Sequence, residues 1–345
     1  MNYTIYDIAK IANVSKSTVS RVLNNQGNTS EIARQRVLKA IEELNYQPSK
    51  LARGLSTAFD AIMVLSRPTS TTTKNPYFSE IIHIISQRAE LENFDVILQT
   101  SKNSTDTLNK CVNKIKEKMI KGIVMLSSPS NEEFFIELDK YNVPVVVIGK
   151  IDGHYTNIFS VDTDNYQDSY NLCTYLIEQG HEKIACIHAP LQYNVSIDRL
   201  HGYQDCLRDH DLPLIDPWIM DGGYTIEDAQ KSLQPLLSMS KMPTAIFATD
   251  DSKVVSSYKF ALDNGLEIPD DLSIAGYGNS NTVPYLNPPL TRIEIPFDNL
   301  GQTAMDLLFN KIKINTSVPL RTILPTKMWY EQSVANKKTP KAEEY

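Results

Sequence analysis

The stretch "TIYDIAKIANVSKSTVSRVLNN", residues 4–25, decides how the chain begins to fold. Its first half carries apolar side chains at helical spacing, with Ile8 and Ala9 on the apolar face. Thr4 can cap this helix, and Asp7 stands three positions later, as in a capping box. The pattern therefore predicts a short amphipathic helix at the start of the stretch.

The second half of the stretch has an unusual composition for a helix. After a turn at Asn13 and Val14, Ser15 can cap a helix from Lys16 to about Leu23. Hydroxyl residues and two cations fill this helix, although Ser and Thr are mediocre helix formers. A helix that enters the major groove of DNA needs short side chains for close approach and a few long donors that read bases. Because a merely polar surface helix would more often carry Glu, Lys and Ala, the composition favours DNA recognition.

A third helix is expected to follow from a Ser30 cap through "EIARQRVLKAIEELNY". Its apolar residues recur at helical spacing, namely Ile32, Val37, Leu38, Ile41 and Leu44. Three short helices with a tight turn between the first two describe a helix-turn-helix. We therefore expect residues 1–46 to form an all-α DNA-binding domain.

Charge is distributed unevenly along the 345 residues. Residues 1–60 hold eight Lys or Arg and five Asp or Glu, a net charge of +3. The whole chain has a net charge of −7, so the remaining residues carry −10. A basic head on an acidic body suggests that only the head meets a polyanion. No apolar run approaches the roughly 18 residues of a membrane helix, and the N-terminus lacks the apolar stretch of a signal peptide. We expect a cytoplasmic protein with no membrane partner.

The residues that usually carry metal or catalytic chemistry form no recognisable motif. Cys111, Cys173, Cys186 and Cys206 lack CxxC or zinc-like spacing and are expected to be reduced and mostly buried. There is no HxxxH, nucleophile elbow, P-loop or GxGxxG. Cleft carboxylates could act as a glycosidase pair, but the DNA-binding head makes binding the simpler role. We expect no enzyme activity, no metal and no cofactor. A secreted sugar-binding protein would lack such a head.

The body alternates apolar strands with amphipathic helices, which is typical of parallel sheets covered on both faces. The expected strands are 61–66, 95–100, 122–127, 144–149, 183–189, 244–249 and 272–278. Ligands of such sheets bind beyond the carboxyl ends of the strands. We therefore looked for polar side chains directly after these segments.

The head resembles the N-terminus of the LacI/GalR family of bacterial transcription regulators. The resemblance rests on residues 4–25 and on "VLKAIEELNYQPSKLARGLST", and it is nearly continuous from Thr4 to Ser56. It implies that base contacts come from Lys16, Ser17 and Arg21, and that the DNA backbone is held by Tyr6, Thr18 and Asn24. The partner would be double-stranded operator DNA.

The segment "YQPSKLARGLS", residues 46–56, resembles the hinge helix of this family. Leu51, Ala52 and Leu55 are spaced for an amphipathic helix, which is too short to persist alone in water. The resemblance implies that two copies fold together in the minor groove, with Lys50, Ala52 and Leu55 against DNA and Leu55 wedged into the central base step. This implies a homodimer on a near-palindromic operator. A plain interdomain connector is the alternative interpretation.

The body resembles the periplasmic-binding-protein-like fold, an α/β fold of two Rossmann-like lobes around a cleft. In that fold the chain crosses between the lobes three times, here expected near Val161, Leu290 and Leu320. We expect the hinge helix and linker at 47–60, the body at 61–333 and a tail at 334–345. Within the body, lobe one is expected to comprise about 61–161 and 291–320. Lobe two is expected to comprise about 162–290 and 321–333.

The strand ends supply the side chains that a sugar requires, namely carboxylates, amides, an arginine and aromatic rings. The candidates are Asn75, Tyr77, Phe78, Asp162, Asp164, Asn165, Arg199, Trp218, Asp250 and Asn279. Tyr77 and Phe78 could equally be packing residues. "DRLHGY" resembles the family motif whose arginine grips the effector, which singles out Arg199; a surface salt bridge is the alternative. "GYGNS" departs from the commoner family pattern, because Gly278 stands where an Asp is usual, so Asn279 or a water would bond the hydroxyl.

The finer resemblance is to the maltose-operon repressor branch, on "NPYFSEII", "SVDTDN", "DRLHGY" and "RIEIPFDNLG". It implies a repressor of maltose- or maltodextrin-type sugar utilisation genes that a small sugar effector releases from DNA. The alternative is a global catabolite-control regulator that a phosphorylated carrier protein activates. The tail lacks leucine heptads, which favours a dimer over a coiled-coil tetramer.

Overall fold

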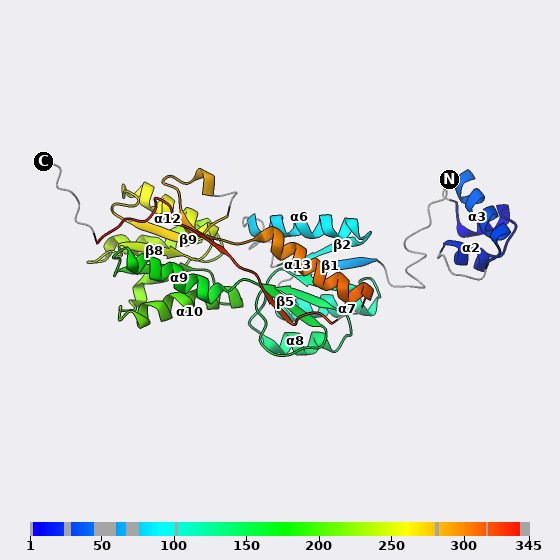
Figure 1. Ribbon diagram of the computed structural model, residues 1–345, viewed down its shortest axis with the longest axis horizontal. Helices are drawn as coiled ribbons and strands as arrows, with labels where there is room; N and C mark the ends of the chain where they lie inside the picture. The colour runs from blue at the N-terminus through cyan, green and yellow to red at the C-terminus, as the bar shows by residue number, and fades with distance from the viewer. Residues whose placement is uncertain are drawn as a thin grey trace. The chain divides into compact units, whose positions relative to one another are not determined.

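The computed structural model describes residues 3–23, 29–44, 60–66, 76–100, 103–279, 283–314 and 317–338. The chain forms two compact units, Met1–Phe59 and Asp60–Tyr345 (Figure 1). Several expectations fall outside the described residues: the hinge helix, the DNA contacts of Asn24, Lys50, Ala52 and Leu55, and the effector contact of Asn75. They are not evaluated by the structure.

The first unit contains the three expected helices, α1 (Ile5–Ile11), α2 (Lys16–Leu23) and α3 (Glu31–Glu43). Their shared core consists of Ile8, Ala9, Ala12, Val19, Val22, Val37 and Ala40. Ile32 and Leu38 were expected on the buried face of α3, but they are 69% and 46% exposed. So small a core covers only a narrow stripe of its third helix, and that stripe is centred on Val37 and Ala40.

Side-chain caps fix where the first two helices begin. The backbone N–H and the hydroxyl of Thr4 both donate to Asp7 Oδ2, at 2.7 and 2.8 Å. Ser15 Oγ accepts from the backbone N–H of Thr18 at 3.1 Å. These bonds satisfy groups that a helix N-terminus otherwise leaves unpaired. Asn13 lies between the two helices with φ of 51°, a left-handed conformation that Asn tolerates better than most residues.

The first lobe of the body is a six-stranded sheet of order β11-β5-β4-β3-β1-β2, and every pair in it is parallel. Its strands are β1 (Ala61–Ser66), β2 (Asp95–Thr100), β3 (Gly122–Met125), β4 (Val145–Ile148), β5 (Ile158–Asp162) and β11 (Arg321–Ile323). Its helices are α6 (Pro76–Leu91), α7 (Ser104–Lys116), α8 (Glu132–Asp139) and α13 (Phe297–Phe309), the last followed by a π-helical turn, Asn310–Ile314.

The second lobe has the order β12-β10-β9-β8-β6-β7, and only the β10–β12 pair is antiparallel. Its strands are β6 (Ile184–His188), β7 (Ile219–Asp221), β8 (Ala245–Ala248), β9 (Ser273–Tyr277), β10 (Thr291–Glu294) and β12 (Lys327–Trp329). Its helices are α9 (Asn165–Glu178), α10 (Asn194–Asp209), α11 (Ile226–Leu233) and α12 (Asp251–Asp263), with 3₁₀ turns at Asp216–Trp218, Gln234–Ser238 and Val283–Tyr285.

Both sheets are buried on both faces, because helices cover each side. Along β1, Ile62 and Val64 join the apolar cluster of α6 and α13, whereas Met63 and Leu65 join that of α7 and α8. This alternation is the two-residue period of a strand, and it explains why a continuous apolar run forms β1. All four cysteines are free and buried, as expected. No helix in the described ranges has the length and apolarity of a membrane span.

Two of the crossings between the lobes lie later in the chain than expected. Thr291–Glu294 pairs with β9 and β12 in the second sheet, so the crossing expected near Leu290 follows Glu294. Arg321–Ile323 pairs with β5 in the first sheet, so the crossing expected near Leu320 follows Ile323. These strands have three or four residues, too few for an apolar pattern to indicate their partners.

Gly202 sets how closely α9 and α10 pack. A Cβ at this position would lie 2.3 Å from the backbone oxygen of Tyr166 and 2.9 Å from Ser169 Cβ. We predict that Gly202→Ala forces the helices apart and destabilises the body by about 1–3 kcal/mol, the usual cost of overpacking. Urea unfolding followed by circular dichroism measures this. His201→Ala, an exposed neighbour on α10, is the control, and equal midpoints for the two variants would contradict the close packing.

Candidate functional site

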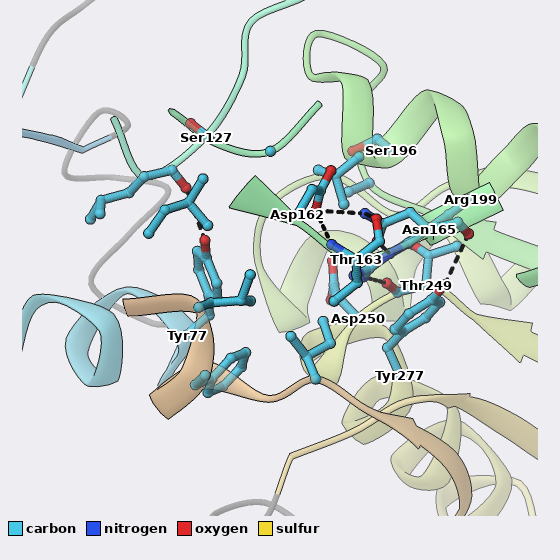
Figure 2. A pocket seen from close by; sticks show the side chains of 18 of the residues that line it. Tyr77, Ser127, Asp162, Thr163, Asn165, Ser196, Arg199, Thr249, Asp250 and Tyr277 are labelled. Carbon is cyan, nitrogen blue, oxygen red and sulfur yellow. Dashed lines mark hydrogen bonds between the residues drawn. The ribbon is translucent and has the colours of Figure 1, made fainter. Parts of the chain in front are cut away.

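A cavity of about 860 Å³, including its open mouth, lies between the two lobes at the carboxyl ends of their strands (Figure 2). Strand-end residues of both lobes line it, including Leu126 and Ser127 after β3, Asp162 and Thr163 at the end of β5, and Thr249 and Asp250 after β8. The cavity is the candidate effector site.

Most of the expected effector residues line this cavity. They are Tyr77, Phe78, Asp162, Asn165, Arg199, Asp250 and Asn279. Asp164 does not line it: its carboxylate is exposed and accepts from the Gln167 backbone N–H at 3.1 Å, which caps α9. Trp218 does not line it either, since it is 4% exposed within the apolar core of lobe two. Trp218 ends a 3₁₀ turn directly before β7, and an isolated aromatic residue at such a place indicates packing as readily as binding.

Arg199 lies at the base of the polar half of the cavity and is 7% exposed. Its Nε donates to Asn165 Oδ1 at 2.8 Å, its Nη1 donates to the carbonyl of Thr249, and its guanidinium carbon lies 3.5 Å from the centroid of the Tyr277 ring. Among the described residues Arg199 pairs with no carboxylate within 4.0 Å. The alternative of a surface salt bridge is therefore wrong.

Asp162 ends β5 beside this arginine and is almost fully buried. Its Oδ1 accepts both from the Thr163 backbone N–H at 2.8 Å and from Asn165 Nδ2 at 3.1 Å. Burial raises the pKa of Asp162 to about 6, although the Thr163 bond and the charge of Arg199 act in the opposite direction. This carboxyl group therefore changes its charge near neutral pH.

Asp250 caps α12 and is held in its charged form. It accepts from the Lys253 backbone N–H at 3.1 Å, and the ammonium of Lys253 lies 3.3 Å from Oδ2. Burial alone would raise the pKa of Asp250, but Lys253 and the Ser252 hydroxyl lower it below its usual value. Lys253 is itself buried, and it also donates to the Gly223 carbonyl at 2.6 Å. The Lys253 ammonium thus keeps a second carboxylate of the cavity, that of Asp250, ionised.

The wall contributed by lobe one is mainly apolar. The Tyr77 ring packs edge-on against Phe78 and Phe297, with centroids 5.0 and 5.2 Å apart, and its hydroxyl donates to the Leu126 carbonyl at 3.1 Å. Figure 2 shows Tyr77 across the cavity from the polar cluster around Arg199. Tyr77 and Phe78 therefore combine the two roles that the sequence left open, since they pack in the core and line the cavity.

Several lining residues were not expected from the sequence. They are Ser127, Ser128, Thr163, Ser196, Thr249, Asp251 and Tyr277, with apolar neighbours such as Ile148 and Leu300. Thr249 and Asp251 flank Asp250 in "ATDD", so their place after a strand was a usable signal. Tyr277 belongs to the strand itself, and nothing in an apolar strand pattern indicates that its ring supports an arginine.

The structure describes five of the expected DNA contacts, Tyr6, Lys16, Ser17, Thr18 and Arg21. Lys16 and Arg21 are exposed, as is Tyr6. The ammonium of Lys16 lies 3.1 Å from the Tyr6 hydroxyl and 4.7 Å from the centre of its ring. Ser15 Oγ is 2.7 Å from Ser17 Oγ and 2.8 Å from Thr18 Oγ1. In the part of the chain that is described, no cluster of His, Cys, Asp and Glu could hold a metal.

The raised pKa of Asp162 makes stability depend on pH. Folding favours the neutral carboxyl, so its contribution is present below about pH 4 and is lost as the pH rises through about 6. We predict that Asp162→Asn, whose Oδ1 can keep both bonds, is more stable than the wild type at pH 8, by on the order of 3 kcal/mol. The advantage should vanish at pH 4. Thermal unfolding across this range measures it.

The matched control for this measurement is Asp164→Asn. Asn caps a helix as well as Asp does, so this variant should follow the wild type at every pH. An Asp162→Asn protein whose unfolding temperature also follows the wild type from pH 4 to 8 would show that the carboxylate is not penalised by burial.

Two family models match the chain. Residues 62–333 match periplasmic binding proteins and the sugar binding domain of the LacI family, and residues 4–49 match bacterial regulatory proteins of the lacI family. The expected fold class, an N-terminal helix-turn-helix domain followed by a two-lobed periplasmic-binding-protein-like α/β body, is thereby confirmed.

Curated relatives and solved structures agree with these matches. The chain is 32% identical to the HTH-type transcriptional repressor PurR of Aliivibrio salmonicida, over 90% of this chain and 92% of that protein. It is 33% identical to catabolite control protein A of Priestia megaterium, over 96% and 99%. It shares the fold of the lac repressor dimer bound to operator and the anti-inducer ONPF, with a TM-score of 0.82 and 24% identity over 97% and 100%. It also shares the fold of the CelR–cellobiose complex, with a TM-score of 0.72 and 24% identity over 96% and 99%. The chain therefore belongs to the LacI family of bacterial DNA-binding transcriptional regulators.

Proposed function

We propose that this regulator is a homodimeric repressor of sugar-utilisation genes, and that a neutral saccharide in the interlobe cavity releases it from its operator. The observation that carries the proposal is the composition of the cavity. Within the described ranges, the buried guanidinium of Arg199 has no carboxylate partner, and it lies near Asp162 and Asp250, opposite the aromatic wall of lobe one.

Each part of this cavity suits one part of a sugar. Carboxylates accept from hydroxyl groups, and the guanidinium donates to hydroxyl or ring oxygens. The rings of Tyr77 and Phe297 offer an apolar surface to the C–H faces of a pyranose. The carboxylates of Asp162, Asp250 and Asp251 outnumber the two cations beside them, Arg199 and Lys253, which favours a neutral sugar over a sugar phosphate.

The cavity can couple sugar binding to DNA binding because both lobes line it. A ligand that contacts both lobes favours the lobe arrangement in which all contacts are made, and it shifts the population towards that arrangement. The lobes also meet beside the cavity, where the Lys150 ammonium lies 3.1 Å from Asp198 Oδ1 and Asn194 Nδ2 donates to the Lys150 carbonyl at 2.9 Å. The expected hinge contacts of Lys50, Ala52 and Leu55 would transmit the change to the minor groove.

Maltose or a maltodextrin is the sugar that we propose. Its support is the sequence resemblance of "NPYFSEII", "SVDTDN" and "DRLHGY", segments whose residues include Tyr77, Asp162, Asn165 and Arg199 of the cavity wall. A panel of saccharides read by operator release tests the choice. Release by another neutral sugar, with no response to maltose, would refute the maltose assignment while leaving the repressor proposal intact.

The likeness to catabolite control protein A favours a second candidate, a regulator activated by a phosphorylated carrier protein. In that case the carrier would raise operator affinity in the absence of sugar. Operator binding measured with and without the phosphorylated carrier separates the two functions, because the first candidate requires no carrier and responds to sugar alone.

The role proposed for Arg21 is to donate to a guanine edge. We predict that Arg21→Ala weakens operator binding by about 1–3 kcal/mol and weakens binding to random DNA less, since only base contacts carry specificity. Fluorescence anisotropy on both DNAs measures this, with Arg36→Ala on the exposed side of α3 as the control. Equal losses on operator and random DNA would mean that Arg21 contacts only phosphate.

The role proposed for Arg199 is to hold the sugar. We predict that Arg199→Ala keeps operator affinity but loses release by sugar, because the guanidinium contributes to the cavity and not to the head. Operator release across a maltose titration measures this. Arg208→Ala, an exposed arginine of the same helix, should release normally. Release of the Arg199→Ala protein at the wild-type sugar concentration would show that the cavity is not the effector site.

A further inference from the structure

Asn279 and Asp251 form a clamp at the edge of the cavity. The backbone N–H of Asn279 donates to Asp251 Oδ1 and its side-chain Nδ2 donates to Asp251 Oδ2, both at 3.0 Å. Asn279 follows β9 and Asp251 begins α12, and both are more than nine-tenths buried. The backbone bond holds the chain at position 279 against Asp251, and the side-chain bond directs Nδ2 to that carboxylate, which determines which way the amide faces.

The clamp leaves one polar atom of Asn279 without a partner. Its Oδ1 is buried and accepts no hydrogen bond from any residue that the structure describes, and the Thr249 hydroxyl likewise has no partner among them. An unpartnered buried polar atom is costly, and native proteins keep few of them. Both residues line the cavity, so a ligand bound there is the candidate partner for these atoms.

The preceding residue explains why Asn279 has this position. A Cβ on Gly278 would lie 2.8 Å from Leu290 Cδ2 and 3.2 Å from Val283 Cγ2, so apolar side chains already fill the space beside it. Asn279 is therefore the first residue after β9 whose side chain lines the cavity. A carboxylate at position 279 would replace the Nδ2 donor with an oxygen facing Asp251 Oδ2 and would repel it, which explains an amide at this point.

We propose that Asn279 Oδ1 is the acceptor that selects one hydroxyl group of the saccharide, and that Asp251 is the positioning residue that holds the amide in this orientation. The inference rests on the proposed function, because it concerns the same cavity. An amide oxygen accepts and cannot donate, so it requires an O–H or N–H on the ligand at this point and rejects a ligand that lacks it.

The experiment uses the full-length chain and isothermal titration calorimetry with glucose, maltose, cellobiose, sucrose and trehalose. The tightest of these is then compared with its monodeoxy analogues. We expect one analogue to lose about tenfold or more in affinity for the wild type, as expected when a buried acceptor is left unpaired. Asn279→Leu should lose a similar factor for the parent sugar and should no longer distinguish the parent from that analogue.

The Asp251 variants test the positioning role separately. Asp251→Ala frees the amide, so we expect it to lose discrimination against the same analogue and against no other. Asp251→Asn keeps an acceptor oxygen for one of the two Asn279 donors, so it should restore part of that discrimination. Asp263→Ala, at the opposite end of α12, is the control and should bind like the wild type. Operator affinity and unfolding temperature show which variants are folded.

The possible outcomes separate this inference from the proposed function. Equal saccharide affinity for the wild type and Asn279→Leu, with operator release intact, overturns the inference alone. Asp251→Ala with unchanged discrimination overturns the positioning role. If the wild type binds none of the saccharides, both the proposed function and the inference are wrong. Should Asn279→Leu fail to fold, the analogue series on the wild type and on Asp251→Asn decides the question.

Discussion

The polar half of the cavity depends on a buried guanidinium that is satisfied without an ion pair. Transfer of Arg199 out of water is costly unless its donors are bonded. The side chain of Asn165, the carbonyl of Thr249 and the ring of Tyr277 meet this need, and they come from α9, the end of β8 and β9. The arginine therefore stabilises the fold only if these elements converge on α10. The Tyr277 hydroxyl strengthens the convergence, since it donates to the Asn165 carbonyl at 3.1 Å.

The convergence of these elements on Arg199 explains sequence features that sugar binding alone would not require, such as the glycine at position 202. α9 and α10 must approach closely for Asn165 to meet Arg199, and Gly202 permits the approach because it has no side chain. The surroundings of the two nearby carboxyl groups shift their pKa values in opposite directions. Asp162 is destabilised as an anion by burial, whereas Asp250 is held ionised by Lys253 and Ser252. One cavity thus offers a sugar one carboxyl that titrates near neutrality and another that stays charged.

The sequence predicted the parts of the structure that local physics determines. The caps at Thr4 and Ser15 indicate where α1 and α2 begin, and the long apolar run of β1 can only be a strand buried on both faces. It could not predict which sheet receives Thr291–Glu294, because its neighbours β9 and β12 are determined by the whole topology. In the same way, its place after a strand indicated Asp250 as a polar candidate, whereas Arg199 was singled out by the family resemblance of "DRLHGY". The clamp between Asp251 and Asn279 joins residues far apart in sequence and has no local signature.

The division of chemistry between the lobes gives the cavity its capacity to act as a switch. Lobe one contributes mainly aromatic and aliphatic contacts, and lobe two contributes the arginine and most of the polar groups. A ligand with only one of these characters could be held by one lobe and would have no preference for their spacing. A saccharide has both characters, because its C–H faces are apolar and its edges are polar. The saccharide gains its full binding free energy only in the lobe arrangement in which both walls contact it. Linkage requires such a difference in binding free energy between lobe arrangements if the sugar is to affect the DNA-binding head.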